Sequence, residues 1–241
     1  MQTKTIYLLH GWAISAVNES KWQQLRTFLK KQGIDTIFLA LPGLSSPLDR
    51  PWTLQSYVEW LAEQLPKEEK VVLLGHSFGG QLATRFAAQY PKRLSKLILI
   101  ASAGIRDYSF FAVAKRSVFY TLAKVGGFAK NNHTLKSLLY KLAREQDYNQ
   151  ADEIMKKTMA SVLSDEVKKD IPNVTCETLL IWGKRDKSTP YTNTRFFLQI
   201  PRSKLVTMPD ARHSPQFTHA AEVAENIATF VKPSGKKELN A

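Results

Sequence analysis

Residues 71–89 restrict the fold of this chain more than any other segment, because an apolar run meets a helical pattern there with one short turn between them. The run Val72-Leu73-Leu74 is typical of a buried strand, and residues 81–89 place apolar side chains three and four apart. The turn reads Gly75-His76-Ser77-Phe78-Gly79. So sharp a turn strains the backbone at Ser77, and glycines two positions before and after it let neighbouring chain pass without a clash.

The same turn places Ser77 at the N-terminus of a helix. The first backbone N–H groups of a helix have no partner within it, and together with the positive end of the helix dipole they favour developing negative charge. A Gly-x-Ser-x-Gly string is common by chance, but here the strand before it and the helix after it are those that a nucleophile elbow requires. We therefore interpret Ser77 as a nucleophile.

Short aliphatic runs alternate with helix-length amphipathic segments along the whole chain, as in βαβ units. The apolar runs lie at 5–9, 36–39, 71–74, 97–100, 178–182 and 204–207. The helical patterns lie at 21–31, 54–65, 81–89, 192–199 and 220–231. The sequence predicts an α/β fold in which a mostly parallel sheet of about six strands is flanked by helices.

One long segment interrupts this alternation. Residues 104–170 contain no strand pattern, but they carry helical patterns at 111–125, 135–144 and 152–163. An insert of this length is too long for a loop, so it is expected to form a helical cap over one sheet edge. The core is then residues 1–103 with 171–233, and 234–241 is expected to be a flexible tail.

A nucleophilic serine needs a base and a group that orients the base. Asp186 follows the run 178–182, and His213 lies between the run 204–207 and the last helix. We interpret Asp186 as the orienting acid and His213 as the base. Asp210 is a rival acid, but it stands three residues before His213 and would need a tight local bend to reach it.

The loop after the first strand reads His10-Gly11-Trp12 and is the expected second part of an oxyanion hole. Its backbone N–H, from Trp12, would act beside that of Phe78, and one such donor is commonly worth about 10² to 10³ in rate. His10 comes first in the chain, so with Gly11 it is interpreted as ordering this loop and not as the base.

The remaining candidates favour ordinary structural roles. The side chain of His76 is expected to point away from Ser77 and to pack against the site, and His133 and His219 are expected to be surface or helix residues. Cys176 is the single cysteine and is interpreted as a core residue. No metal-ligand spacing occurs, so no metal site is predicted.

Taken together, the His10-Gly11 loop, Leu41-Pro42-Gly43, the elbow at Ser77, Gly183-Lys184-Arg185-Asp186 and His213 resemble the α/β-hydrolase superfamily. The order serine, aspartate, histidine is also the order of that fold. The resemblance implies cofactor-free hydrolysis in which the serine attacks a carbonyl and water later releases the acyl group. The motifs look like those of the group that includes carboxylesterases, pimeloyl-carrier-protein methyl esterases and carbon-carbon bond hydrolases.

The charge of the chain is unusual. It carries a net +13, of which residues 104–144 contribute +7, whereas residues 145–171 are net acidic. A cationic half of the cap could bind an acidic carrier protein or an anionic substrate, although a solvated basic face explains the same composition. Without a nucleic-acid motif, no nucleic-acid partner is predicted.

Two further features bear on location. The longest nearly apolar run, residues 97–104, is far shorter than the roughly 20 residues of a membrane-spanning helix. No secretory signal pattern begins the chain, so a cytoplasmic location is expected.

The predicted function is the hydrolysis of a carboxylic ester of a small or acyl-chain substrate through an acyl-enzyme. Three alternatives in the same class stay open, namely a carbon-carbon bond hydrolase, a thioesterase and a hydrolase of carrier-linked esters. An alternative of another class is a receptor that binds a small molecule without turnover.

Overall fold

Six parallel strands form the centre of the computed structural model, which describes residues 4–12, 18–105 and 152–232. The strands are β1 (Lys4–Leu9), β2 (Ile34–Leu39), β3 (Val71–His76), β4 (Leu94–Ile100), β5 (Glu177–Gly183) and β6 (Ser203–Met208). They pair in the order β2-β1-β3-β4-β5-β6, and every pair is parallel. The predicted fold class is confirmed, and each of the six apolar runs lies within one strand.

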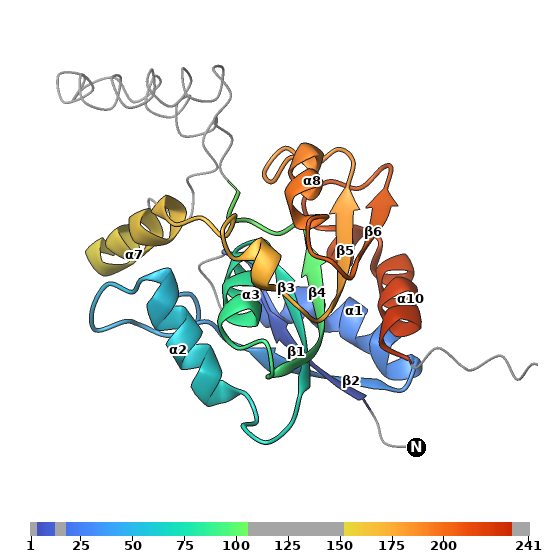
Figure 1. The fold of residues 1–241 in the computed structure, drawn as a ribbon, viewed down its shortest axis with the longest axis horizontal. Coiled ribbons are helices and arrows are strands. Elements are labelled where there is room, and N and C mark those ends of the chain that lie inside the picture. The colour runs from blue at the N-terminus through green and yellow to red at the C-terminus, as the bar shows by residue number, and fades with distance from the viewer. Residues whose placement is uncertain (1–3, 13–17, 106–151, 233–241) are drawn as a thin grey trace, which may run out of the picture.

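Helices cover both faces of this sheet (Figure 1). The longer ones are α1 (Asn18–Lys31), α2 (Leu54–Gln64), α3 (Phe78–Gln89), α7 (Glu153–Ser164) and α10 (Ala220–Val231). Helices α1 and α10 pack together on one face, and α2 packs against α3 on the other. None of the described helices is long and apolar enough to cross a membrane.

The burial pattern explains why the central strands read as continuous apolar runs. Every residue of β3 is buried, and so are all residues of β5 after the first, because helices lie on both faces. The edge strands β2 and β6 are only partly buried, which is why polar residues interrupt them. Since all strands run the same way, their carboxyl ends meet at one edge of the sheet, where sites form in such folds.

The predicted helix at 192–199 is too long. The segment instead forms a 3-10 turn at Tyr191–Asn193 and then the four-residue helix α8 (Thr194–Phe197). The Thr194 hydroxyl bonds to the Tyr191 carbonyl at 2.7 Å, so a side chain competes with the helical ladder there. Two other short helices were not predicted, a 3-10 turn at Ile171–Asn173 and α9 (Pro215–Thr218).

Most of the predicted cap, including the helical patterns at 111–125 and 135–144, lies outside the described residues, as does the predicted tail. Helix α7 lies where a helix was predicted at 152–163. Its N-cap, Asp152, accepts a hydrogen bond from the Met155 N–H at 2.7 Å, which supplies a partner for one of the first N–H groups of the helix.

Polar contacts attach the segment after α7 to α3, close behind the Ser77 turn. The Arg85 guanidinium binds Asp170 at 2.6 Å, Asp165 at 2.8 Å and the Glu166 carbonyl at 2.8 Å. One turn earlier, the Gln81 amide donates to the Asp165 carbonyl at 3.0 Å. Because α3 begins directly after Ser77, these contacts hold the chain that returns from the insert against the helix that follows the nucleophile turn.

The Arg85 cluster yields a stability prediction. Replacement of Arg85 by Met removes donors from two half-buried carboxylates, and we expect the free energy of unfolding to fall by about 1–3 kcal/mol. Urea denaturation measures the change. Arg202→Met is the matched control, because it breaks a more exposed pair with Glu177 and should cost less than about 1 kcal/mol. Equal losses in the two variants would contradict this interpretation of the cluster.

Candidate active site

Ser77 occupies a backbone conformation that residues other than glycine rarely adopt, with φ 54° and ψ −115°. Two backbone hydrogen bonds hold it there. The Ser77 N–H donates to the Ile100 carbonyl at 3.1 Å, and the Ala103 N–H donates to the Ser77 carbonyl at 2.9 Å. The end of β4 therefore stabilises the strained turn between β3 and α3.

Close backbone contacts explain the two glycines of the turn. A Cβ on Gly79 would lie 2.5 Å from the Leu9 carbonyl oxygen, and a Cβ on Gly75 would lie 2.3 Å from the Gly79 oxygen. Both distances are too short for any side chain. The first turn of α3 is thus in direct contact with the end of β1, which brings Ser77 beside the loop that follows β1.

Ser77, His213 and Asp186 form one hydrogen-bonded row at the carboxyl ends of three strands. The Ser77 Oγ lies 3.0 Å from His213 Nε2, and His213 Nδ1 lies 2.8 Å from Asp186 Oδ2. An ionised carboxylate only accepts, so Nδ1 carries the proton and Nε2 can accept from the serine hydroxyl. The structure brings together three residues that are 27 or more positions apart in the sequence.

Asp186 is held by its own loop as well as by His213. Its Oδ1 accepts from the Ser188 N–H at 2.7 Å and the Thr189 N–H at 3.1 Å, and its Oδ2 lies 2.8 Å from the Thr189 hydroxyl. Burial alone would raise the pKa of Asp186, but the bonds from His213, Ser188 and Thr189 outweigh burial and lower it. The group therefore stays a carboxylate facing the imidazole.

Thr189 is a site residue that the sequence analysis missed. Its hydroxyl lies 2.8 Å from Asp186 Oδ2, 3.3 Å from His213 Nδ1 and 3.0 Å from the Ala101 carbonyl. The Trp182 indole N–H donates to its carbonyl at 2.8 Å. In a turn, an aspartate side chain often accepts hydrogen bonds from the residues two and three positions later. This pattern at Asp186 could have pointed to Thr189.

The rival acid Asp210 does not reach the imidazole. It forms a 2.6 Å ion pair with Arg185, and the side chains of both residues are exposed. The Arg185 N–H donates to the Ala211 carbonyl at 3.1 Å, so the loops after β5 and β6 are joined at this point. That connection sets Asp186 and His213 on adjacent loops while it directs Asp210 to the surface.

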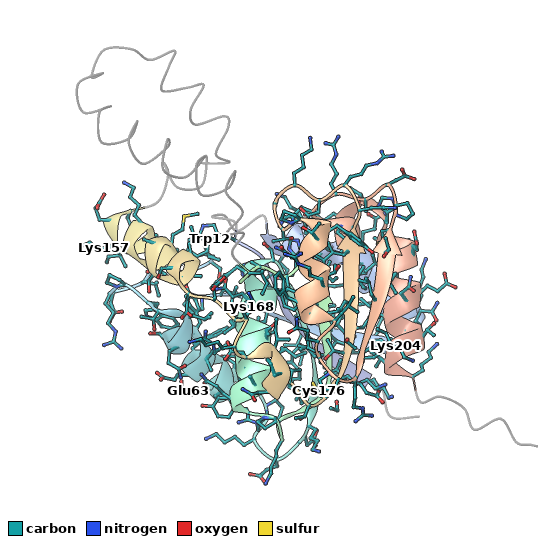
Figure 2. The ribbon with its side chains drawn as sticks, turned by 45° about the horizontal axis from the view of Figure 1, so that its top comes forward. Trp12, Glu63, Lys157, Lys168, Cys176 and Lys204 are labelled. Carbon is teal, nitrogen blue, oxygen red and sulfur yellow. The ribbon has the colours of Figure 1, made fainter. Side chains whose placement is uncertain are left out.

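The two residues predicted to form the oxyanion hole are close together. The rings of Trp12 and Phe78 lie 5.4 Å apart, edge to face, and Phe78 is the first residue of α3, whose N–H has no acceptor within the helix. Figure 2 shows Trp12 on the side of the core that faces α7, whereas Cys176 is at the far end of the sheet. The role of the two N–H groups stays a prediction.

His10 connects the loop after β1 to the loop after β2. Its Nδ1 donates to the Gly11 carbonyl at 2.8 Å, and its Nε2 accepts from the Leu41 N–H at 3.0 Å. The ring stacks on Phe38 with centroids 5.2 Å apart. Burial lowers the His10 pKa to about 4, partly offset by the bond to Gly11, so the ring is neutral at pH 7.

His76 is buried, as the sequence suggested, but it also makes a hydrogen bond that the sequence did not predict. Its Nε2 lies 3.0 Å from the His213 carbonyl oxygen. Of the other histidines, His219 is half-buried at the start of α10 and bonds to Thr218, and His133 lies outside the described residues. In the described part of the chain, no cluster of three or more His, Cys, Asp or Glu could hold a metal ion.

Comparison with known proteins shows the family and the fold. The model of the alpha/beta hydrolase family matches residues 6–226. A pimeloyl-[acyl-carrier protein] methyl ester esterase of Nitrosomonas europaea is 27% identical over 87% of this chain and 88% of its own length. One from Legionella pneumophila (strain Paris) is 26% identical over 96% of each chain. An alpha/beta hydrolase enzyme from a Medee basin deep-sea metagenome library has a similar fold, with a TM-score of 0.70, 20% identity and coverage of 95% and 90%.

The two buried neutral histidines predict how stability depends on pH. Burial lowers the pKa of His10 to about 4 and that of His76 to about 3 from an ordinary 6.5. Between these values and 6.5 the unfolded chain binds more protons, so stability rises with pH in that window. We expect unfolding free energy to fall by on the order of 2 kcal/mol per histidine from about pH 7 to about pH 5.

Urea denaturation across this pH range measures the effect. In His10→Asn, about half of the pH dependence should disappear, because one of the two histidines is gone. The depressed pKa of Asp186 acts only below the ordinary carboxyl range and does not contribute in this window. A free energy of unfolding that stays constant between about pH 5 and about pH 7 would contradict the assignment of both rings as buried and neutral.

Proposed function

This chain belongs to the alpha/beta hydrolase family, and from that membership we propose that it is a serine esterase with Ser77 as its nucleophile. The observation that carries the proposal is the 3.0 Å contact from Ser77 Oγ to His213 Nε2, continued by the 2.8 Å contact to Asp186. Nucleophile, base and orienting acid within hydrogen-bond distance are the arrangement that acyl transfer by a serine needs.

The first half of the proposed reaction forms an acyl-enzyme. The Ser77 Oγ attacks the ester carbonyl carbon while its proton passes to His213 Nε2, and the carbonyl electron pair moves onto oxygen. The backbone N–H groups of Trp12 and Phe78 stabilise that oxyanion. Asp186 stabilises the imidazolium without taking its proton. The tetrahedral intermediate then collapses, His213 returns the proton to the leaving alkoxide, and an alcohol departs.

The second half consumes water. His213 takes a proton from a water molecule, whose oxygen attacks the acyl carbon, and the same two N–H groups hold the second oxyanion. When the bond to Ser77 breaks, the proton returns to its Oγ and a carboxylic acid leaves. No cofactor enters these steps, since every proton and electron pair that moves belongs to the substrate, to water or to these side chains.

The names of the relatives favour an ester carried by an acyl-carrier protein as the more specific substrate. Two relatives that cover most of this chain are named as pimeloyl-[acyl-carrier protein] methyl ester esterases. Carrier proteins with an acidic surface would be attracted to the net +7 of residues 104–144, the half of the predicted cap that is rich in lysine and arginine. Thioesters, activated carbon-carbon bonds and binding without turnover remain the competing functions.

Hydrolysis of p-nitrophenyl esters from acetate to long acyl chains tests the esterase proposal. We expect turnover by the wild type and at least a 10³-fold lower rate in Ser77→Ala, on the order of magnitude that loss of a triad nucleophile brings. The chain length with the highest kcat/KM measures the acyl pocket. Folded wild-type protein that hydrolyses none of these esters nor a carrier-linked methyl ester would contradict the proposal.

Two aspartates allow a matched test of the acid. Asp186→Asn should lower kcat by about 10² to 10⁴-fold, because an amide no longer holds His213 in the tautomer that accepts the serine proton. Asp210→Asn changes the same functional group three residues from His213, but its partner is Arg185 on the surface. It should leave kcat within about twofold of the wild type. Equal losses in the two variants would reverse the assignment of the acid.

A further inference from the structure

His76 links the nucleophile strand to the loop that carries the base. It is the last residue of β3 and directly precedes Ser77, and its side chain is almost wholly buried. Its Nε2 lies 3.0 Å from the backbone carbonyl oxygen of His213, 137 positions later in the chain. A carbonyl oxygen only accepts, so the proton of the neutral ring is on Nε2.

The ring of His76 is enclosed by its neighbours, so it cannot turn to another partner without disturbing them. Trp22 and Phe217 meet it edge to face with centroids 6.1 Å and 6.2 Å away, and the His213 ring lies 5.0 Å away. On the oxyanion side, Gly11 is so close that a Cβ there would lie 2.9 Å from His76 Nδ1. One side chain thus contacts both the base loop and the loop that precedes Trp12.

The loop that carries His213 is held on both sides of the base, and His76 bonds to the His213 carbonyl between these supports. Before it, the Ala211 carbonyl accepts from the Arg185 N–H, and after it the Ser214 carbonyl accepts from Phe217. The bond from His76 therefore fixes the peptide unit of the base itself. A displacement of about 1 Å in a reacting group is enough to lower a rate on the order of 10²-fold.

We propose that His76 is a positioning residue, which through its bond to the His213 carbonyl keeps His213 Nε2 within hydrogen-bond distance of Ser77 Oγ. The inference rests on the proposed function, because it concerns the same reaction. It goes beyond that function by adding a residue that touches neither substrate nor the reacting atoms.

The chemistry of imidazole suits this role. Burial, and then the proximity of His213, keep the His76 ring uncharged at neutral pH. A neutral ring donates its hydrogen bond without adding positive charge 5.0 Å from the ring of His213, which becomes an imidazolium in the reaction. A lysine or arginine could donate to the same carbonyl, but it would oppose that imidazolium and raise the barrier.

Two substitutions separate the hydrogen bond from the packing. His76→Gln keeps an N–H donor near the position of Nε2, whereas His76→Leu has a similar volume and no donor. The readout is the second-order rate at which an alkyl fluorophosphonate labels Ser77, together with kcat and KM on the best p-nitrophenyl ester. The labelling rate depends on activation of Ser77 by His213 and does not require that esters be turned over. His219→Gln is the control histidine.

For His76→Leu we expect labelling and kcat to fall roughly 10- to 100-fold with KM nearly unchanged. His76→Gln should recover most of this loss and stay within about threefold of the wild type, although both variants lose the same aromatic contacts. His219→Gln should label like the wild type. The midpoints of thermal unfolding of the Leu and Gln variants should be similar, so that stability does not explain the difference in rate.

Equal rates in His76→Gln and His76→Leu would overturn the inference and leave His76 a packing residue. If His76→Leu does not fold, His76→Phe supplies a ring without a donor and is compared with His76→Gln in the same way. Failure of the proposed function gives a different result: wild-type protein would react with the fluorophosphonate but turn over no ester. The labelling rates of the His76 variants would still decide the role of His76.

Discussion

The strained turn at Ser77 is the constraint on which the rest of the site depends. A non-glycine residue with φ 54° persists only where its surroundings hold it, and here the end of β4 does so through Ile100 and Ala103. The turn requires that α3 begin against the end of β1, which in turn requires glycine at positions 75 and 79. The sheet order, with β3 between β1 and β4, is what makes these contacts possible.

Three histidines, His10, His76 and His213, differ in chemistry because their hydrogen-bond partners differ. His10 is buried between two loops and uses both ring nitrogens for backbone groups. His76 is buried behind the nucleophile and donates to a carbonyl. Of these three, His213 has a carboxylate on one nitrogen and a hydroxyl on the other, which is the arrangement that the proposed general acid-base role needs.

The sequence predicted all six strands but overestimated the length of one helix, and the difference has a physical reason. Central strands buried on both faces give long aliphatic runs, so the runs within β3 and β5 were unambiguous. The segment 192–199 has helical spacing, yet the Thr194 side chain bonds to the nearby Tyr191 carbonyl and the α-helix is only Thr194–Phe197. Local competition of this kind does not alter the spacing of apolar residues, so periodicity could not reveal it.

The sequence by itself determined the α/β class, the turn around Ser77 and the candidates Asp186 and His213, because each follows a strand whose pattern is plain. Only the tertiary structure decided that Thr189 lies beside His213, that Asp210 pairs with Arg185, and that His76 bonds to the His213 carbonyl. These contacts depend on how the loops after β5 and β6 meet each other and the end of β3. Residues distant in sequence meet at these loops because of the path of the folded backbone. The spacing of residue types along the chain does not reveal that path.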